Sequence, residues 1–517
     1  MSVNGLKSLK PTLSFKQLNQ IHAQIIKIPQ PHILNTLLKL LTQSSTPQNA
    51  IPLYNKMLNC PSSYNHYTFT QALKACSLAH AHQKGLEIHA HVIKYGHLHD
   101  IFIQNSLLHF YVTVKDIFSA HQIFNSVVFP DVVTWTTIIS GLSKCGFHKE
   151  AIDMFCGIDV KPNANTLVSV LSACSSLVSH KLGKAIHAHS LRNLNENNII
   201  LDNAILDFYI RCGSLASCGY LFVKMPKRDV VSWTTMIGGY AERGFCEEAV
   251  SVFQEMEKTK EAEPNEATLV NVLSACSSIS ALSFGQYVHS YISTRYDLSV
   301  SNLVGNAVIN MYVKCGDVGI AIQVFNMLAY KDMISWSTVI SGLAMNGCGR
   351  QALQLFSLMI INAVFPDDVT FIALISACSH GGLVDQGLIL FKAMSTVYEI
   401  VPQTQHYACV VDMYGRAGLL EEAEAFIREM PIEAEWSVWG ALLNACRIHR
   451  NDEMFDRIRQ DLVNKKGVNV GTFALMSNTF AGADRWEDAN KIRDEIRRMG
   501  LKKKTGCSWI EVNPSIF

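Results

Sequence analysis

The sequence predicts an all-α solenoid, a right-handed superhelix of stacked helix-turn-helix repeats. Two observations support this prediction. Apolar residues recur at helical spacing along nearly all of the 517-residue chain, and similar segments return at regular intervals. A single helix pair cannot bury both of its apolar faces, whereas a stack of pairs shares one continuous core. A repeat array also accounts for a length that exceeds one compact core.

The repeats are of three kinds, which alternate along the chain. Segments of the first kind begin at Trp135, Trp233 and Trp336 and align without gaps, as in WTTIISGLSKCGFHKEAIDMF. A third kind reads NSLLHFYVTVKD, NAILDFYIRCGS and NAVINMYVKCGD. The tryptophans are 98 and 103 residues apart, so the full period is about 100 residues. The second kind has a short apolar core that ends at Cys76, Cys174, Cys276 and Cys378.

Each repeat reads as two short helices joined by a turn. In the first aligned segment Trp135, Ile138 and Leu142 follow helical spacing, Gly146 then interrupts the helix, and a second apolar stripe follows. Pro162 comes after the second stripe and ends it. The tryptophans and the apolar stripes are therefore predicted to be core residues.

The composition narrows the possible functions. Charged residues make up 17% of the chain and the formal net charge is +1, which argues against sequence-independent binding of polyanions. None of the 15 cysteines forms a Cys-x-x-Cys pair, so neither a zinc ribbon nor a disulfide framework is indicated. Most cysteines lie in apolar runs, where they act as small core residues, and a reducing compartment fits best. No apolar run reaches the roughly 18 residues of a membrane span, which predicts a chain that does not enter a membrane.

The N-terminus is basic and free of acidic residues. No Asp or Glu precedes Glu87, and four lysines lie within the first 27 residues. Together with several serines and threonines, this pattern is typical of an organelle transit peptide, which we predict at residues 1–14.

On these segments the chain resembles the plant organellar pentatricopeptide repeat (PPR) proteins, in the class that alternates P, L and S repeats. A partial L repeat at 15–30, with the segment QIHAQIIK, precedes an array at 31–435, and the S repeat expected between them is missing. The P repeats are placed at 31–65, 132–163, 230–265 and 333–367, the L repeats at 66–100, 164–198, 266–301 and 368–403, and the S repeats at 101–131, 199–229, 302–332 and 404–435.

The tail at 436–513 resembles the E1 and E2 motifs of the same class, and residues 514–517 follow it. The segments that carry this resemblance are WGALLNACRIHRN and SNTFAGADRWEDANKIRDEIRRMGLKKKTGCSWIEV. In many relatives a cytidine-deaminase-like DYW domain comes after GCSWIEV, and none does so here. The resemblance therefore implies the E subgroup.

The sequence offers no catalytic constellation. A zinc deaminase needs His-x-Glu together with Pro-Cys-x-x-Cys. The triplet His148-Lys149-Glu150 matches only the first half and is interpreted as the start of a helix. Neither a phosphate-binding loop nor a nucleophile elbow is present. We therefore predict no catalytic residue, no metal and no cofactor. Histidines that recur at one L-repeat position are predicted to pack between helices, because one per period lies too far from the next to share a metal: His22, His89, His187 and His289.

The resemblance places base recognition at two positions of each repeat, the fifth residue and the last residue. In helical-repeat RNA readers, two or three side chains of one repeat contact one base. Amides, hydroxyls and carboxylates at fixed spacing match the donors and acceptors of one base edge. The polar pairs are Asn35/Asn65, Thr70/Asp100, Asn105/Asp131, Thr136/Asn163, Asn203/Asp229, Thr234/Asn265, Asn306/Asp332 and Ser337/Asp367. The remaining pairs begin with a side chain that cannot hydrogen-bond a base: Val168/Asn198, Val270/Ser301, Ile372/Gln403 and Ala408/Glu435.

A simpler explanation of these polar residues stays open, since Asn, Asp and Thr also cap helices and form turns. Their recurrence as a patterned set favours base reading. The second residue of the same repeats is apolar, and the resemblance implies that it wedges between bases, although packing alone would also select it. These residues are Phe102, Val133, Ile200, Val231, Leu303 and Ile334.

The resemblance implies a site-recognition factor for C-to-U editing of an organellar transcript. It would bind single-stranded RNA as a monomer, and a DYW-type deaminase, with accessory editing factors, would act in trans. A splicing or transcript-stability factor is the alternative within RNA binding. From another class, a protein-interaction scaffold of tetratricopeptide type would keep a uniform period of 34 residues, whereas these repeats alternate between about 31 and 35. The short presequence favours the mitochondrion over the chloroplast.

Overall fold

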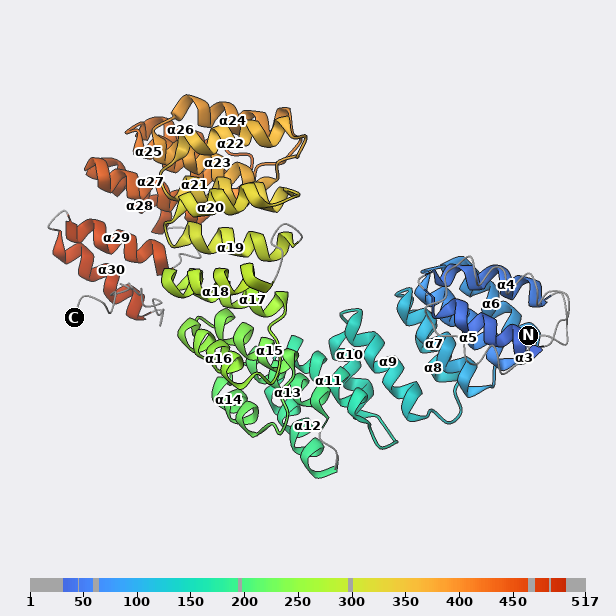
Figure 1. The fold of residues 1–517 in the computed structure, drawn as a ribbon. Helices are drawn as coiled ribbons and strands as arrows, with labels where there is room; N and C mark the ends of the chain where they lie inside the picture. Colours follow the sequence, from blue (N-terminus) through green and yellow to red (C-terminus); the bar gives the residue numbers. More distant parts are fainter. Residues whose placement is uncertain are drawn as a thin grey trace. The chain divides into compact units, whose positions relative to one another are not determined.

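The helical periodicity of the sequence is realised as a series of short α-helices. The computed structural model describes residues 31–44, 46–58, 65–193, 198–295, 301–463, 470–482 and 485–498. Within these ranges the regular structure is α-helical except for one 3-10 turn, Pro47–Asn49, and contains no strand, which confirms the all-α solenoid. The chain divides into two compact units, residues 1–239 and 240–517, and each is described by itself (Figure 1). The predicted transit peptide and partial repeat at 1–30 lie outside the described residues.

The first unit is a stack of helix pairs, one pair for each predicted repeat. The first helix of a pair packs against the first helix of the next pair, and the second helices pack against this row. Its helices are α3 (Pro31–Thr42), α4 (Ala50–Leu58), α5 (His66–Leu78), α6 (His82–Lys94), α7 (Ile101–Thr113), α8 (Ile117–Ser126), α9 (Val132–Lys144), α10 (His148–Cys156), α11 (Ala164–Ser176), α12 (His180–Asn193), α13 (Ile199–Arg211), α14 (Leu215–Lys224) and α15 (Val230–Glu242), whose last turn belongs to the second unit.

The second unit has the same construction. No helix in its described part, or in that of the first unit, combines the length and apolar character that a bilayer span needs. Its helices are α16 (Cys246–Thr259), α17 (Glu266–Ser278), α18 (Leu282–Arg295), α19 (Asn302–Lys314), α20 (Val318–Met327), α21 (Met333–Met345), α22 (Gly349–Ile361), α23 (Asp368–Gly381), α24 (Val384–Thr396), α25 (Thr404–Arg416), α26 (Leu420–Arg428), α27 (Trp436–His449), α28 (Asp452–Val463), α29 (Val470–Gly482) and α30 (Trp486–Arg498).

The repeated aromatic and cysteine residues lie in the core, as the periodicity predicts. Trp135, Trp233 and Trp336 are 8%, 0% and 4% exposed. Cys174 is fully buried, and this burial raises its pKa to about 12, so the thiol acts as a small apolar group. The cysteines at the same position of the other L repeats are equally buried: Cys76, Cys276 and Cys378. Each tryptophan ring meets a phenylalanine of the preceding second helix edge-on, in the pairs Phe124–Trp135, Phe222–Trp233 and Phe325–Trp336, with centroids 4.8, 4.9 and 4.8 Å apart.

A half-buried histidine–tyrosine hydrogen bond joins each of the first three L repeats of the array to the S repeat that follows it. In the first unit Nδ1 of His187 on α12 lies 2.8 Å from the hydroxyl oxygen of Tyr209 on α13. Burial lowers the pKa of His187, so its ring stays neutral at neutral pH. The same contact recurs as His89–Tyr111 at 2.6 Å and His289–Tyr312 at 2.9 Å. The predicted packing role of these histidines is confirmed, and His22 lies outside the described residues.

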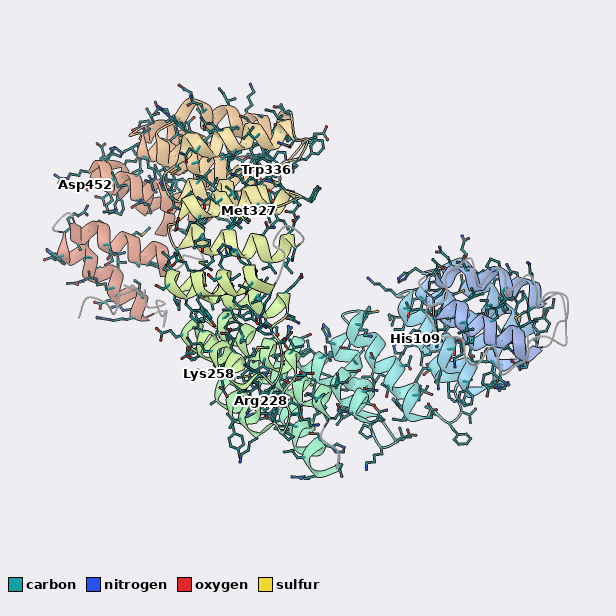
Figure 2. The ribbon with its side chains drawn as sticks, viewed as in Figure 1. His109, Arg228, Lys258, Met327, Trp336 and Asp452 are labelled. Atoms are coloured by element: carbon teal, nitrogen blue, oxygen red, sulfur yellow. The ribbon has the colours of Figure 1, made fainter. Side chains whose placement is uncertain are left out.

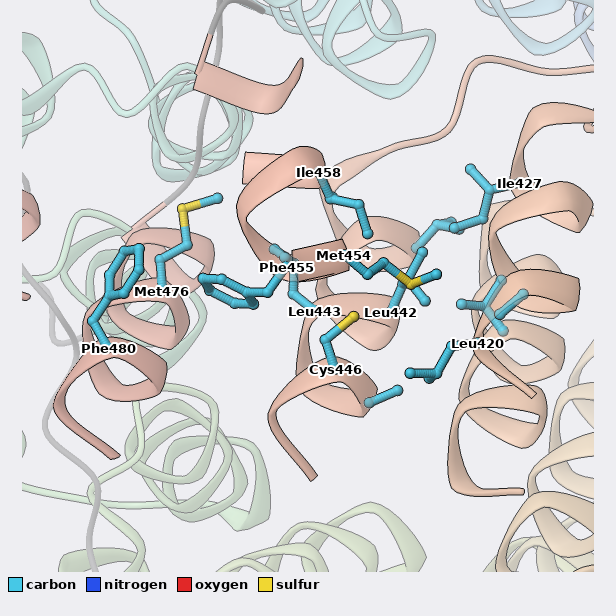
Figure 3. Close-up of a cluster of buried hydrophobic side chains, with 14 of the residues drawn as sticks. Leu420, Ile427, Leu442, Leu443, Cys446, Met454, Phe455, Ile458, Met476 and Phe480 are labelled. Carbon is cyan, nitrogen blue, oxygen red and sulfur yellow. The ribbon is translucent and has the colours of Figure 1, made fainter. Parts of the chain in front are cut away.

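The tail continues the stack instead of folding apart from it. Side chains of α27 to α30 share one buried cluster with α25 and α26 of the last S repeat (Figure 3). Leu442 and Phe455 lie in this cluster, and Phe455 meets the ring of Phe480 edge-on at 5.3 Å. The buried carboxylate of Glu424 on α26 is bound by Arg428 and by Arg457 of α28. The helix pair α27–α28 therefore covers the apolar end of the repeat array, as a terminal cap does in solenoids.

The glycine on the second helix of an L repeat allows a close approach between helices. A Cβ on Gly183 would lie 2.1 Å from the ring of Phe208 on α13. We expect Gly183→Ala to destabilise the fold by about 1–3 kcal/mol, since the ring cannot retreat within a packed core. Gly319→Ala is the matched control, because this helix glycine has only Asp317 within 4 Å, at 3.8 Å. Thermal melts of both variants test the prediction, and equal melting points would contradict it.

The buried histidines predict a pH dependence of stability. Because burial lowers the folded-state pKa of His89, His187 and His289, the unfolded chain binds protons more readily. Stability is therefore fully present above the unfolded pKa of about 6.5 and is lost as the pH falls below it. We expect His187→Gln, which can still hydrogen-bond Tyr209, to reduce the fall in melting temperature between pH 7 and pH 5. His99→Gln, at an exposed site, should leave that fall unchanged, and an equal effect of both variants would refute the assignment.

Candidate nucleic-acid interface

The last residue of most repeats caps the first helix of the next repeat. The side-chain oxygen of Asp131 accepts the backbone N–H of Thr134 at 2.8 Å, and that of Asn163 accepts the N–H of Thr166 at 2.9 Å. The capping explanation considered for these residues is therefore correct. The same geometry holds at the N-termini of α5, α15, α17, α21 and α23, where the caps are Asn65, Asp229, Asn265, Asp332 and Asp367.

The same cap oxygen also holds the fifth residue of its own repeat. In the first S repeat the amide of Asn105 donates from Nδ2 to Oδ1 of Asp131 at 3.3 Å. The hydroxyl of Thr134 then donates to Oδ1 of Asn105 at 2.7 Å, which closes a three-residue network between neighbouring repeats. The network recurs as Asn203/Asp229/Ser232 and, in the first P repeat, as Asn35/Asn65/Thr68. Capping and pairing are thus two uses of one atom, and the cap does not exclude base reading.

The networks leave one polar atom of each last residue for a ligand. Oδ1 of Asp131 is used by the cap, and Oδ2 has no hydrogen-bond partner among the described residues. Burial opposes ionisation, but hydrogen bonds from Thr134 and Asn105 outweigh it and hold the pKa of Asp131 below its usual value. The aspartate therefore presents a charged acceptor. Asn163 also caps through Oδ1, so its remaining group, Nδ2, is a donor.

The third S repeat departs from this arrangement. Asn302, at the first position, donates from Nδ2 to Oδ2 of Asp332 at 3.3 Å, whereas the other two complete S repeats have Ile101 and Ile199 there. Oδ1 of Asn306 is buried and has no partner in the described part of the chain, because the Ser335 hydroxyl donates to Asp332 at 2.7 Å. Sequence reasoning missed Asn302, although a polar residue at a position that is otherwise isoleucine was a visible signal.

We call the residues at the fifth and last positions of each repeat, which are predicted to contact the base, the readers. The hydroxyl readers at the fifth position of the P and L repeats are held by their own helix. Thr136 donates to the carbonyl of Val132 at 2.6 Å, and its oxygen lies 2.6 Å from the hydroxyl of Thr166. Thr70 and Ser337 donate to the carbonyl three residues before them. Thr234 lies at the same position of α15. In the other three L repeats the fifth position holds an apolar residue that is half-buried: Val168, Val270 and Ile372.

The apolar residues at the second position lie in solvent, so packing does not explain them. Their exposed fractions range from 49% to 67%, although each sits one turn or less from a buried residue of the same helix. Exposed apolar side chains at regular intervals along one face mark a binding surface. The six predicted residues all share this exposure: Phe102, Val133, Ile200, Val231, Leu303 and Ile334.

A hollow of about 520 Å³ opens on this face in the first unit. Its walls come only from the first helices α5, α7 and α9 and the cap before α9. They include the predicted readers Thr70, Asn105 and Asp131 and the exposed apolar residues Phe102 and Val133. The structure thus brings together polar and apolar residues that the sequence assigned to one ligand, and a flat ring fits between apolar side chains of this spacing.

The predicted pair Thr70/Asp100 is not joined in this way. Oδ1 of Asp100 accepts the backbone N–H groups of Phe102 and Ile103 at 2.9 and 3.2 Å, so it caps α7. No hydrogen bond joins Asp100 to Thr70 among the described residues, and Asp100 does not line the hollow that Thr70 lines.

The backbone gives the reason for this difference. The ψ angle of Asp100 is 120°, against 177° at Asp131, and the cap side chain of the L repeat accepts from the N–H groups of both Phe102 and Ile103. The Thr70 hydroxyl is already bonded within α5. The threonine side chain is also too short to reach Asp100 across the junction between the repeats. Asp100 is therefore a helix cap in this structure, and its part in base reading stays a prediction.

The described residues hold no group of three or more His, Cys, Asp or Glu side chains that could bind a metal ion. Glu150 of the His148-Lys149-Glu150 triplet lies 3.6 Å from His121 of the preceding second helix. The triplet begins α10, as predicted.

Comparison with known families identifies the repeats. The E motif matches residues 449–511, within the predicted tail. The PPR repeat family matches 228–278 and 331–380, and single PPR repeats match 128–157, 306–332, 369–396 and 406–433.

Similar chains occur in Arabidopsis thaliana. Pentatricopeptide repeat-containing protein At1g08070, chloroplastic, is 35% identical over 94% of this chain and 70% of its own length. At2g22410, mitochondrial, is 33% identical over 94% of this chain and 77% of its own length. The crystal structure of the pentatricopeptide repeat protein PPR10 from maize covers 95% of this chain and 77% of that chain with a TM-score of 0.58; at 15% identity this is a likeness of fold. With its alternating repeats and its E motif, the chain belongs to the pentatricopeptide repeat family.

Proposed function

We propose that this chain binds one specific single-stranded RNA sequence and marks a site for C-to-U editing in an organelle, with a deaminase supplied in trans. One observation carries the RNA-binding part. A polar network that leaves one hydrogen-bonding atom unused occurs in the first P repeat and in the first two complete S repeats, and exposed apolar side chains lie at the second position of the same array. Such a surface offers each base a stacking partner and one defined donor or acceptor.

The chemistry of the last residue suggests how bases are told apart. Uracil and guanine carry an N–H on the ring nitrogen of the pairing edge, whereas adenine and cytosine carry an unprotonated ring nitrogen. The carboxylate of Asp131 or Asp229 accepts from the first pair of bases, and the amide of Asn163 or Asn265 donates to the second pair. A wrong base leaves a polar group unpaired, and this loss is the source of discrimination.

The fifth residue would then separate large from small bases. Family preferences assign U to Asn with Asp, A to Thr with Asn, G to Ser or Thr with Asp, and a pyrimidine to Asn with Asn. Read in order with the N-terminal repeats on the 5′ side, the pairs give 5′-Y-G-U-A-N-U-A-N-U-G-N-N, then three unread nucleotides and the edited C. The first G, assigned to Thr70/Asp100, is the weakest position, because these two side chains are not joined. A binding selection from random RNA tests the assignment, and recovery of a motif unrelated to UANUANUG would overturn it.

A single-residue exchange tests whether the last residue reads the base. We expect Asn163→Asp to change the preference at that nucleotide from A to G, because the donor Nδ2 becomes an acceptor. Aspartate caps a helix as well as asparagine does, so α11 is preserved. Each mismatch should cost about 1–3 kcal/mol, measured by competition between the A and G forms of the RNA. Asn125→Asp, with the same charge change on the exposed side of α8, should leave both affinities unaltered. Equal weakening of both RNAs by Asn163→Asp would count against base reading.

Truncation of the C-terminal tail tests the proposed role in editing. Removal of residues 436–517 would uncover Tyr407, Val411 and Leu420, which pack against α27 and α28, so a loss of editing there could reflect unfolding. Removal of 464–517 keeps this helix pair. We expect the shorter chain to bind its RNA with unchanged affinity and to fail in editing, because the readers all precede residue 436. Editing is measured by sequencing organellar transcripts, and normal editing by the shorter chain would refute a recruiting tail.

The relatives, which are labelled chloroplastic or mitochondrial, fit an organellar site of action. A splicing or stability factor is the second candidate, and organellar RNA from plants with and without the protein separates the two: editing defects favour the first and splicing or abundance defects the second. A protein scaffold would instead show no RNA preference in the selection.

A further inference from the structure

In each of the first four repeats, the C-terminal half of the first helix carries one basic side chain. Lys39, Lys74, His109 and Lys144 follow one another at intervals of 35 residues. On their helices, Lys39, Lys74 and His109 come four residues after the proposed readers Asn35, Thr70 and Asn105, and Lys144 comes eight after Thr136. Residues four apart lie on one helix face, one turn from each other. The basic side chains therefore run parallel to the readers.

Two of these four side chains line the hollow on the reading face of the first unit. Lys74 and His109, of which Figure 2 labels His109, line the same hollow as Thr70 and Asn105. Burial and the charges of Lys144 and Lys74 lower the pKa of His109, so both ammonium groups act on this ring. The imidazole is neutral at neutral pH and offers one N–H donor between two cations.

The three lysines of this row are exposed and have no acidic partner among the described residues. The carboxylate of Asp131 also lines the hollow, but its Oδ1 is committed to the cap of α9. Arginines on the corresponding faces of other S repeats are instead neutralised by their own helix. Arg211 is bound to Asp207 at 2.9 Å, and Arg416 to Asp412 at 2.7 Å.

Unpaired basic side chains become rare after the fourth repeat. Eight residues after the reader, where Lys144 lies, later repeats have Arg211 and Arg416, which are paired with aspartates, and the exposed Lys314. The residue four positions after the reader is Ser172, Asp207 and Gly238 in the rest of the first unit, and Ser274, Asn310, Ser341, Ser376 and Asp412 in the second. Lys314 is the one lysine on the first helices α17 to α25 of the second unit. In a chain with a net charge of +1, three unpaired lysines thus lie on the first helices of the four repeats at the N-terminal end of the array.

We propose that Lys39, Lys74 and Lys144, with the N–H of His109 between them, bind the phosphodiester backbone of the RNA segment that lies on repeats 31–163. This inference rests on the proposed RNA binding and adds a division of labour to it. The first four repeats hold the backbone by charge, and the later repeats hold the RNA through its bases. Binding should therefore depend on salt chiefly through this one end.

The test compares the full chain with Lys39→Gln/Lys74→Gln/Lys144→Gln, using the RNA recovered from the binding selection. Each lost phosphate contact lowers the slope of log affinity against log salt by about 0.7, so we expect the slope to fall by about 2 and the affinity near 0.15 M salt to fall roughly 50-fold. The base preferences at later repeats should be unchanged. The matched control is Lys149→Gln/Lys181→Gln/Lys184→Gln, which removes the same charge from exposed sites on α10 and α12. Equal losses in both variants would overturn the proposal.

A second measurement on the unaltered protein guards against misfolding of the variant. Methylphosphonates, which are uncharged, replace the phosphates at either end of the RNA. We expect the salt slope to fall when the replaced end is the one on repeats 31–163, and to hold when it is the other end. An unchanged slope in both cases, with binding and base preference intact, would refute the phosphate contacts and leave the proposed function standing. Absence of any RNA binding would refute the proposed function itself.

Discussion

The hydrogen bond that a cap oxygen accepts at the start of most first helices is the constraint on which the interface depends. An uncapped helix leaves backbone N–H groups unsatisfied, so an Asn or Asp is needed at the junction of two repeats for stability alone. Because Oδ1 of Asp131 is fixed by the N–H of Thr134, the second polar atom of this side chain points in a set direction. Its orientation costs no further entropy when a ligand binds. A structural requirement of the repeat thus prepares a recognition group once per period.

This coupling also joins neighbouring repeats at their junctions. The amide of Asn105 or Asn203 is fixed from two sides, by the cap and by a buried hydroxyl of the next helix. A reader held in this way belongs to two repeats at once, so its position follows the register of the stack. The close contact of Gly183 with Phe208 and the His187–Tyr209 bond set that register from the other side of the helix pair. Packing and reading are therefore linked: a shift between repeats would misplace the donor or acceptor that meets the base.

Much of the fold could be predicted from the sequence, because the same residue pattern recurs in several repeats. Trp135 and Cys174 were identified as core residues from spacing alone, and the solenoid follows from the need to bury both faces of each pair. Other features depend on contacts that no single repeat reveals. The role of Thr134 could not be predicted, since a Thr three residues after a cap has a sufficient local reason to be there. The core shared by Leu442 and Leu420 crosses the border between the array and the tail. The repeat pattern changes there, so alignment of the repeats with one another does not predict this contact.

The candidate site was predicted less evenly than the core. Asp100 and Asp131 occupy the same position of their repeats and read alike in the sequence, yet only Asp131 bonds the fifth residue of its own repeat. The difference lies in the backbone angle at the cap and in the reach of the partner, since Asn105 extends an amide across the junction and Thr70 does not. Neither the backbone angle nor the reach of the partner can be deduced from the presence of an aspartate. The last position of a repeat therefore predicts a helix cap better than it predicts a base-reading residue.

The near-neutral charge was a sound argument against indiscriminate polyanion binding, yet it concealed how the charge is distributed. A formal sum cannot distinguish a lysine that faces solvent alone from an arginine bound by the aspartate one turn away. Lys74 and Arg211 contribute equally to the net charge, but only Lys74 is left with its field uncompensated on the reading face. If the phosphate contacts are confined to four repeats as proposed, an RNA that lacks the right bases further along would bind weakly, because the later contacts would carry little charge of their own. The arrangement would then favour selectivity, since the sequence-independent part of the binding energy would be small.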